Sequence, residues 1–73
     1  MTDDELLMGM EMAARAERDQ GFLGYAKPPK NLWDDCRRLV KERLVKEHPF
    51  TPGFFMPTGK GSLRVSHRIH RAQ

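Results

Sequence analysis

The prolines constrain this chain more than any other feature. Pro28 and Pro29 form one group, and Pro49, Pro52 and Pro57 form a second group that closes the middle of the sequence. Proline removes an amide hydrogen and clashes with the preceding helical turn, so no helix continues through either group. Long elements are therefore expected only before, between and after these two groups.

The first stretch predicts a helix over residues 3–19. Thr2 and Glu5 have the spacing of a capping box, and Gly21 suits a left-handed helix end. Gly9 weakens the helix, and its second half is mostly alanine and charged residues. Residues 1–26 are therefore expected to be an acidic N-terminal helix and linker, loosely attached and mobile in the free protein. The aromatic and leucine side chains of the linker indicate that it has apolar surface to bury.

The second stretch predicts a helix over residues 32–47. Asn31 is the expected N-cap, Asp34 and Asp35 suit the first turn, and Pro49 follows the end. Trp33 is expected at the centre of the core that this helix builds. The apolar stripe with helical spacing consists of Leu32, Cys36, Leu39, Val40 and Leu44.

The third stretch predicts a β-hairpin over residues 54–69. Phe54 to Met56 suit a short edge strand, residues 58–61 a turn, and apolar and basic residues alternate from Ser62 onward. The alternation sets Leu63, Val65, His67 and Ile69 against Arg64, Ser66, Arg68 and His70. The predicted fold is a small single α+β domain in which the central helix packs on a C-terminal β-hairpin. Residues 27–73 form its basic helix-plus-hairpin part.

Charge is distributed unevenly along the chain. Residues 1–26 contain six acidic and two basic residues, a net charge of −4, whereas residues 27–73 contain four acidic and eleven basic residues, a net charge of +7. No acidic residue follows Glu47. The C-terminal part is therefore expected to meet an anionic partner, either a nucleic acid or an acidic protein surface, or to be a solvated basic face.

Catalytic, cofactor and metal sites are not predicted. The stretch around Lys60 lacks the spacing and the following helix of a phosphate-binding loop, and one thiol with three scattered histidines matches no zinc pattern. Cys36 lies on the apolar stripe, where a thiol is usually inert. We expect no enzyme activity and no cofactor. With a single cysteine and no apolar run typical of a leader or membrane span, a soluble monomer in a reducing cytosol is expected.

A binding module remains, and two partner classes are open. Alternate arginines could track phosphates while aromatic rings stack on bases, which describes a small basic nucleic-acid-binding protein, although no known nucleic-acid motif appears. A protein partner is the other class. The residues predicted to contact either partner are Phe54, Phe55, Lys60, Arg64, Arg68, Arg37 and Lys41.

The whole chain resembles a small transcription regulator encoded by a lytic Xanthomonas phage. The similarity lies in the length, the acidic start "MTDDELL", the expected basic helix "NLWDDCRRLVKERLVKEHP" and the expected basic hairpin at the C-terminal end. The resemblance implies a non-enzymatic inhibitor in the cytoplasm of the infected host. It implies contact with the two large subunits of RNA polymerase, beta and beta-prime, displacement of the sigma factor, and antitermination. It assigns no individual binding residue, and it makes direct nucleic-acid contact secondary.

Overall fold

A computed structural model describes the backbone of residues 2–72 and the side chains of residues 2–66. Within this part the chain is α+β and forms one compact domain with a two-stranded antiparallel hairpin, which confirms the predicted fold class. In chain order, the elements are α1 (Asp3–Asp19), the short 3-10 helix η1 (Lys30–Leu32), α2 (Trp33–Lys41), β1 (Val45–Glu47), β2 (Phe55–Pro57) and α3 (Gly59–Ala72).

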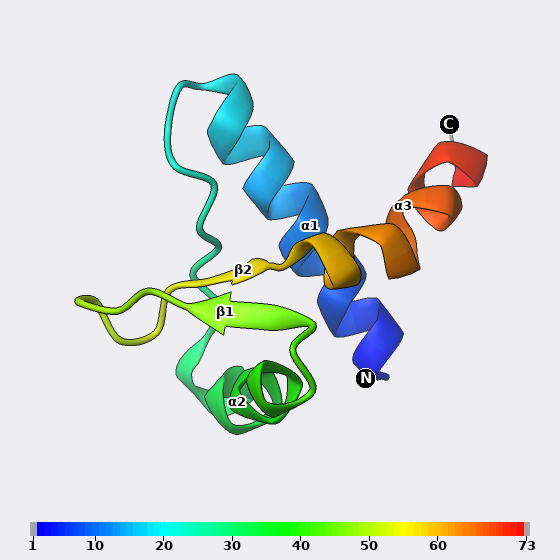
Figure 1. The fold of residues 1–73 in the computed structure, drawn as a ribbon. Helices are drawn as coiled ribbons and strands as arrows, with labels where there is room; N and C mark the ends of the chain where they lie inside the picture. Colours follow the sequence, from blue (N-terminus) through cyan, green and yellow to red (C-terminus); the bar gives the residue numbers. More distant parts are fainter. Residues whose placement is uncertain (1, 73) are drawn as a thin grey trace.

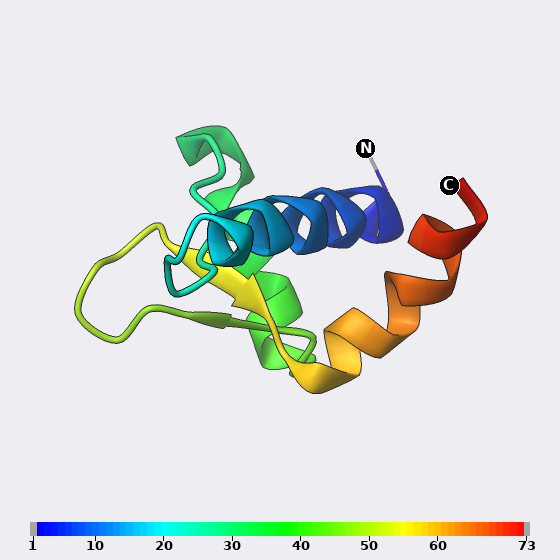
Figure 2. The same ribbon diagram turned by 90° about the horizontal axis from the view of Figure 1, so that it is seen from above.

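The hairpin lies between the helices. β1 and β2 pair with Val45 opposite Pro57 and Glu47 opposite Phe55, and an isolated bridge from Ala26 to Phe55 extends the pairing on the other edge of β2. α1 packs against β2, and α2 packs against β1, so the hairpin is held between two helices (Figures 1 and 2). Phe55 is fully buried at the centre of this arrangement.

α1 is an integral part of the core, so the predicted loose attachment is wrong. Leu7 and Met10 are buried, and Ala14 has no exposed surface. The sequence pattern suggested a weak helix because it gave no sign of how much of this face is covered by β2, α2 and α3. The core cluster consists of Leu6, Leu7, Met10, Ala26, Cys36, Leu39, Leu44, Val45, Phe55 and Val65.

Polar contacts also attach α1 to both other helices. Asp3 accepts two hydrogen bonds from Arg38 on α2, at 2.7 and 2.9 Å. Asp4 pairs with Arg64 on α3, with 2.9 Å between Oδ1 and Nε. The first turn of α1, placed by the capping contact of Thr2, therefore carries the carboxylates that hold α2 and α3.

α2 ends six residues earlier than predicted, because Arg43 takes the left-handed conformation with φ 63°. The amide of Leu44 bonds the carbonyl of Leu39, and the amide of Arg43 bonds the carbonyl of Val40, each at 3.0 Å. These two bonds form a Schellman motif, which terminates a helix and normally uses glycine at the left-handed position. Residues 45–47 are thereby released to form β1. At the other end, Asn31 lies in η1 rather than capping α2.

The predicted strand after Ser62 is wrong, because residues 59–72 form helix α3. Thr58 starts this helix: its Oγ1 accepts a hydrogen bond from the amide of Gly61 at 3.2 Å, as an N-cap residue does. Val65 is buried, whereas Leu63 is exposed, although the strand prediction had placed both on one face. The hairpin strands are therefore residues 45–47 and 55–57, of which only the second was predicted.

We predict opposite outcomes for two leucine truncations. Leu39→Ala should lower the free energy of unfolding by about 2–5 kcal/mol, because it opens a cavity in the core. Leu63→Ala should change it by less than about 0.5 kcal/mol, because that side chain is 77% exposed on α3. Urea unfolding followed by tryptophan fluorescence measures both. Equal stability of the two variants would contradict the described core.

Two glycine-to-alanine substitutions should change the stability of the protein in opposite directions. A Cβ at Gly9 meets nothing within 4 Å, so Gly9→Ala should stabilise the protein by up to about 1 kcal/mol through helix propensity. A Cβ at Gly61 would collide with the backbone carbonyl of Leu44, so Gly61→Ala should destabilise it by about 1–3 kcal/mol. Thermal unfolding compares the two directly. A stabilising Gly61→Ala would show that α3 does not approach Leu44 so closely.

Candidate functional site

The predicted aromatic contact residues differ in accessibility. Phe55 is 0% exposed, so it is a core residue and contacts no partner in this fold. Phe54 is half-buried, and the Nζ of Lys27 lies 5.7 Å from the centre of its ring. The prediction for Phe55 is wrong because this residue begins β2 and is buried in the core, whereas Phe54, which precedes the strand, is only half-buried.

The predicted basic contact residues lie on two different helices, α2 and α3. Arg37 on α2 and Arg64 on α3 each make an ion pair within the chain. Lys41 ends α2, and Lys60 lies in the first turn of α3; both are exposed. The side chain of Arg68 lies outside the described residues. The basic strand face on which this prediction rested is replaced by a helix.

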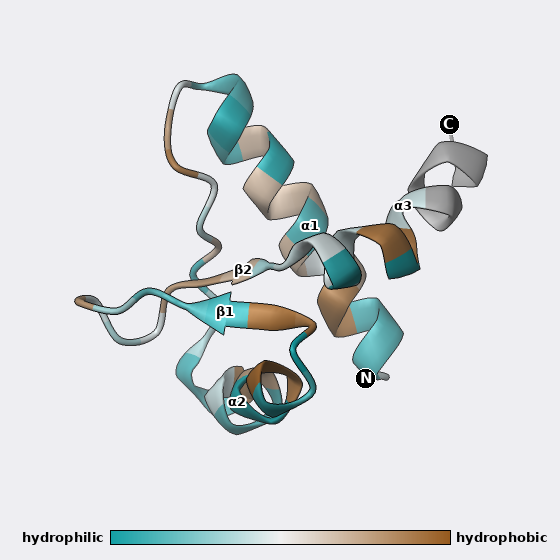
Figure 3. Ribbon diagram, viewed as in Figure 1, coloured by the Kyte–Doolittle hydropathy of each residue, from teal (hydrophilic) through white to brown (hydrophobic). Residues whose placement is uncertain are grey.

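A different group of side chains gathers where two loops meet, and we call it the loop face. It is formed by Phe22, Leu23, Tyr25, His48, Phe50 and Phe54. The loop after α1 and the loop between β1 and β2 lie on the same side of the molecule, away from the C-terminal end of α3 (Figure 1). Both loops carry hydrophobic segments (Figure 3). All but Phe50 line a hollow of about 270 Å³.

The large apolar side chains of the loop face are unusually exposed. Phe50 is 88% exposed, Leu23 77% and Phe22 62%. Single exposed apolar residues are ordinary, but several gathered around one hollow are typical of a surface that binds another protein. The sequence indicated that the linker would bury its apolar residues; only Tyr25 is half-buried, and Phe22 and Leu23 remain in solvent.

His48 fixes the shape of the loop that carries Phe50. Its Nδ1 accepts hydrogen bonds from the amides of Phe50 and Thr51, each at 3.1 Å. Its ring makes edge contacts with Tyr25, with 4.9 Å between centroids, and with Phe50, with 6.2 Å. The neutral tautomer with a hydrogen on Nε2 is the one that fits these two donors. Phe50 is thus presented by a defined turn.

A second set of contacts clamps the other end of the same loop to α2. Arg37 donates two hydrogen bonds to Glu47, at 3.2 and 3.3 Å, and Glu47 accepts a third from the amide of Gly53 at 3.1 Å. The ring of Trp33 packs directly on Gly53, where φ is 90° and a Cβ would collide with the ring. Trp33 is half-buried and lies at the edge of the core, not at its centre as predicted.

The electrostatics of this clamp favour the charged state of both partners. The hydrogen bond from Arg37, followed by that from the Gly53 amide, holds the pKa of Glu47 below its ordinary value of 4.5. The same hydrogen bond with Glu47 raises the pKa of Arg37. Arg37 also lies over the ring of Trp33, at 5.4 Å from its centre. The clamp is therefore ionised at neutral pH.

The remaining groups to consider are the cysteine thiol, the residues that could bind a metal ion and the helices that could cross a membrane. Cys36 is buried, as predicted, and burial raises the pKa of its thiol to about 11. Residues 2–66 contain no group of three histidine, cysteine or acidic side chains close enough to hold a metal ion. Over the described backbone, no helix has the length and apolar character needed to cross a membrane.

Comparisons with protein-family models, with curated proteins and with solved structures found no match to this chain. The function is therefore argued from the loop face, the charges and the resemblance noted in the sequence. Phe50 lies between Pro49 and Pro52, and closely spaced prolines are typical of turns at the surface. This spacing was the only sequence signal, and a weak one, that Phe50 would be exposed.

We predict that acid loosens the clamp. A carboxylate whose pKa is depressed in the folded state contributes stability above its unfolded pKa, and this contribution is lost as the pH falls through the folded pKa. The free energy of unfolding should therefore decrease below about pH 4.5. Urea unfolding from pH 7 to pH 3 should give a flatter pH dependence for Glu47→Gln, and Arg37→Gln should flatten it similarly. An unchanged profile in both variants would contradict the pairing.

Proposed function

We propose that this chain is a phage-encoded regulator that binds bacterial RNA polymerase in the host cytoplasm. It contacts the large subunits beta and beta-prime, inhibits initiation by displacing the sigma factor, and also acts as an antiterminator. It acts by binding and performs no chemistry. The identity of the partner is taken from the resemblance noted in the sequence. The single structural observation that supports a protein-binding regulator is the loop face.

The loop face supports a protein partner because aromatic residues, Phe among them, are enriched in protein interfaces. A few well-packed anchor side chains carry most of the binding energy in such interfaces. Phe50 is held by the turn around His48, and the far end of that loop is held by Glu47. A rigid loop loses little conformational entropy on binding, so more of the contact energy appears as affinity.

The arginines also favour a protein partner over a nucleic acid, because most of the arginines with described side chains form ion pairs within the chain. Arg15 and Arg18 pair with Glu11, Arg37 with Glu47, and Arg38 with Asp3 and Asp35. Tracking phosphates along a nucleic acid requires free cationic groups arranged along a line. In the described part, the exposed lysines are distributed over the linker after α1, η1, α2, β1 and α3.

The size of the chain permits competition with a polymerase subunit. A standard interface buries about 800 Å² on each partner. The described structure has an accessible surface of 5046 Å², so such a contact would occupy roughly one sixth of it. A monomer can therefore bind polymerase through one face while keeping its fold.

The test is binding of purified core polymerase to the immobilised protein, with and without nuclease. Capture should survive nuclease and should decrease when sigma factor saturates the polymerase. The double variant Phe22→Ser/Phe50→Ser should weaken binding by at least about tenfold, as expected for the loss of two aromatic anchors. Leu63→Ser is the matched control, because Leu63 is as exposed as Leu23 but lies on α3, and it should bind as the wild type does.

Nucleic-acid binding gives a different pattern in the same experiment. If the chain tracks phosphates, it should bind duplex or single-stranded DNA at physiological salt, with affinity that falls steeply as salt rises. The Phe22→Ser/Phe50→Ser variant would then keep most of its affinity for duplex DNA. Polymerase captured only in the presence of nucleic acid would contradict the proposed function.

A further inference from the structure

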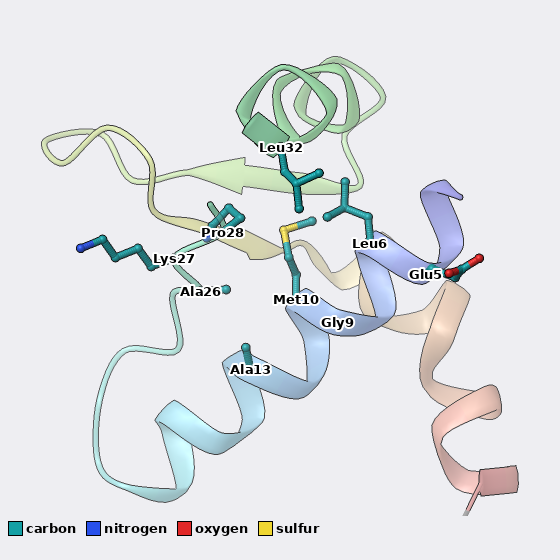
Figure 4. A pocket seen from close by; sticks show the side chains of 9 residues that line it. All are labelled: Glu5, Leu6, Gly9, Met10, Ala13, Ala26, Lys27, Pro28 and Leu32. Atoms are coloured by element: carbon teal, nitrogen blue, oxygen red, sulfur yellow. The ribbon is translucent and has the colours of Figure 1, made fainter. Parts of the chain in front are cut away.

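A second hollow, which we call the α1 groove, lies between α1 and the segment of residues 26–32. Its volume is about 230 Å³. Leu6 and Met10 on α1 and Leu32 on η1 point toward one another at its base, and the small side chains of Ala13 and Ala26 face it from either side (Figure 4). The loop face and this groove share no lining residue, and they adjoin where Lys27 of the groove lies over the ring of Phe54.

Gly9 leaves this groove open, and the packing of the chain itself does not require a glycine there. The residue is exposed in the middle of α1, and a Cβ at this position meets nothing within 4 Å. Glycine at such a position costs the helix about 1 kcal/mol relative to alanine. Because Gly9 has no side chain, the groove stays open at this position of α1, next to Met10.

The size and lining of the groove fit one large apolar side chain. A cavity of about 150 Å³ is known to hold a benzene ring, whereas sites for whole small-molecule ligands are usually about 300 Å³ or larger. The α1 groove lies between these sizes. Only two of the residues that line it, Glu5 and Lys27, carry charged side chains. This lining offers no converging polar groups to orient a cofactor.

Charge at the ends of the groove selects the partner. Glu5 and Lys27 lie at opposite ends (Figure 4). Glu5 is an exposed carboxylate that accepts a hydrogen bond from the hydroxyl of Thr2 at 3.1 Å, so its end of the groove is negative. Lys27 is exposed, and so is Lys30, three residues further along the chain, whose Nζ lies 6.0 Å from the centre of the Trp33 ring. The Lys27 end of the groove is therefore the positive end, and it is the end that favours a carboxylate of a partner.

We propose that the α1 groove is the docking site for one apolar side chain of an acidic protein segment, with Lys27 contacting a carboxylate next to that side chain. Leu6, Met10 and Leu32 bury the apolar group, and Gly9 lets it approach the helix. The docking proposal rests on the proposed function only in requiring a protein partner. To that function it adds a second contact surface, the α1 groove, and the chemical class of segment that this surface recognises. It does not depend on that partner being polymerase.

The test uses a defined probe, the blocked pentapeptide Glu-Leu-Glu-Leu-Glu, titrated into the isotope-labelled full chain and followed by amide NMR shifts. Saturable shifts should concentrate at Gly9, Ala13, Ala26 and Lys27. The peptides Glu-Ser-Glu-Ser-Glu and Lys-Leu-Lys-Leu-Lys, which lack the apolar group or reverse the charge, should produce no saturable shifts there. No saturable shift with the first peptide, or equal binding of either control peptide, would overturn the proposal.

Variants of the chain sharpen this test. Gly9→Leu fills the groove and should abolish the saturable shifts, while Lys27→Glu should weaken binding by about fivefold or more. Ala16→Leu places the same bulk on an exposed position of α1 outside the groove and should leave the affinity within about twofold of the wild type. Heteronuclear spectra of the free variants show whether each is folded. Binding retained by a folded Gly9→Leu would overturn the proposal.

Two further outcomes separate the possible occupants. Groove shifts that depend on protein concentration in the absence of peptide would mean that a second copy fills the groove, which would overturn the proposal. Capture of core polymerase by Gly9→Leu and Ala16→Leu then tests the link to the proposed function. If the wild type fails to bind polymerase, the proposed function fails, and the peptide titration still decides the α1 groove.

Discussion

The fold depends on one backbone junction, formed by Arg43, Leu44 and Thr58. The carbonyl of Leu44 accepts the amide of Thr58 at 3.0 Å, and the carbonyl of Arg43 accepts the hydroxyl of Thr58 at 2.6 Å. At this junction α2 ends, β1 begins, β2 ends and α3 starts. Because the same Thr58 hydroxyl also caps α3, the direction of that helix is set by the way α2 terminates. Gly61 then packs on Leu44, which allows α3 to approach the core.

The end of a helix could be predicted from the sequence where glycine occupies the left-handed position, and not where another residue occupies it. α1 ends as predicted, with Gly21 at φ 89° and the amide of Phe22 bonded to the carbonyl of Glu17. α2 ends by the same geometry, but Arg43 occupies the left-handed position, and nothing in its side chain indicates this. α3 had a readable start at Thr58. The alternation of apolar and basic residues that follows Thr58 is short enough to fit either the two-residue period of a strand or the 3.6-residue period of a helix. Gly59 and Gly61 favoured the interpretation as a turn followed by a strand.

The candidate site was less predictable than the fold, because it depends on which charges pair inside the molecule. The sequence shows an acidic N-terminal part and a basic remainder, and this asymmetry suggested an anionic partner. In the folded chain, Asp3 and Asp4 pair with Arg38 and Arg64, so part of the asymmetry is satisfied internally. What remains for a partner is a set of exposed aromatic side chains on two loops, which become neighbours only through tertiary folding.

The buried thiol of Cys36 has a practical and biological consequence. Its Sγ lies 3.9 Å from the sulfur of Met10, and its pKa of about 11, against an ordinary 9.0, reduces the reactive thiolate about a hundredfold. Alkylating and oxidising reagents therefore reach this sulfur only when the core around it opens. The rate of thiol labelling therefore measures how often the core opens, and burial of the sulfur disfavours a disulfide between two folded chains.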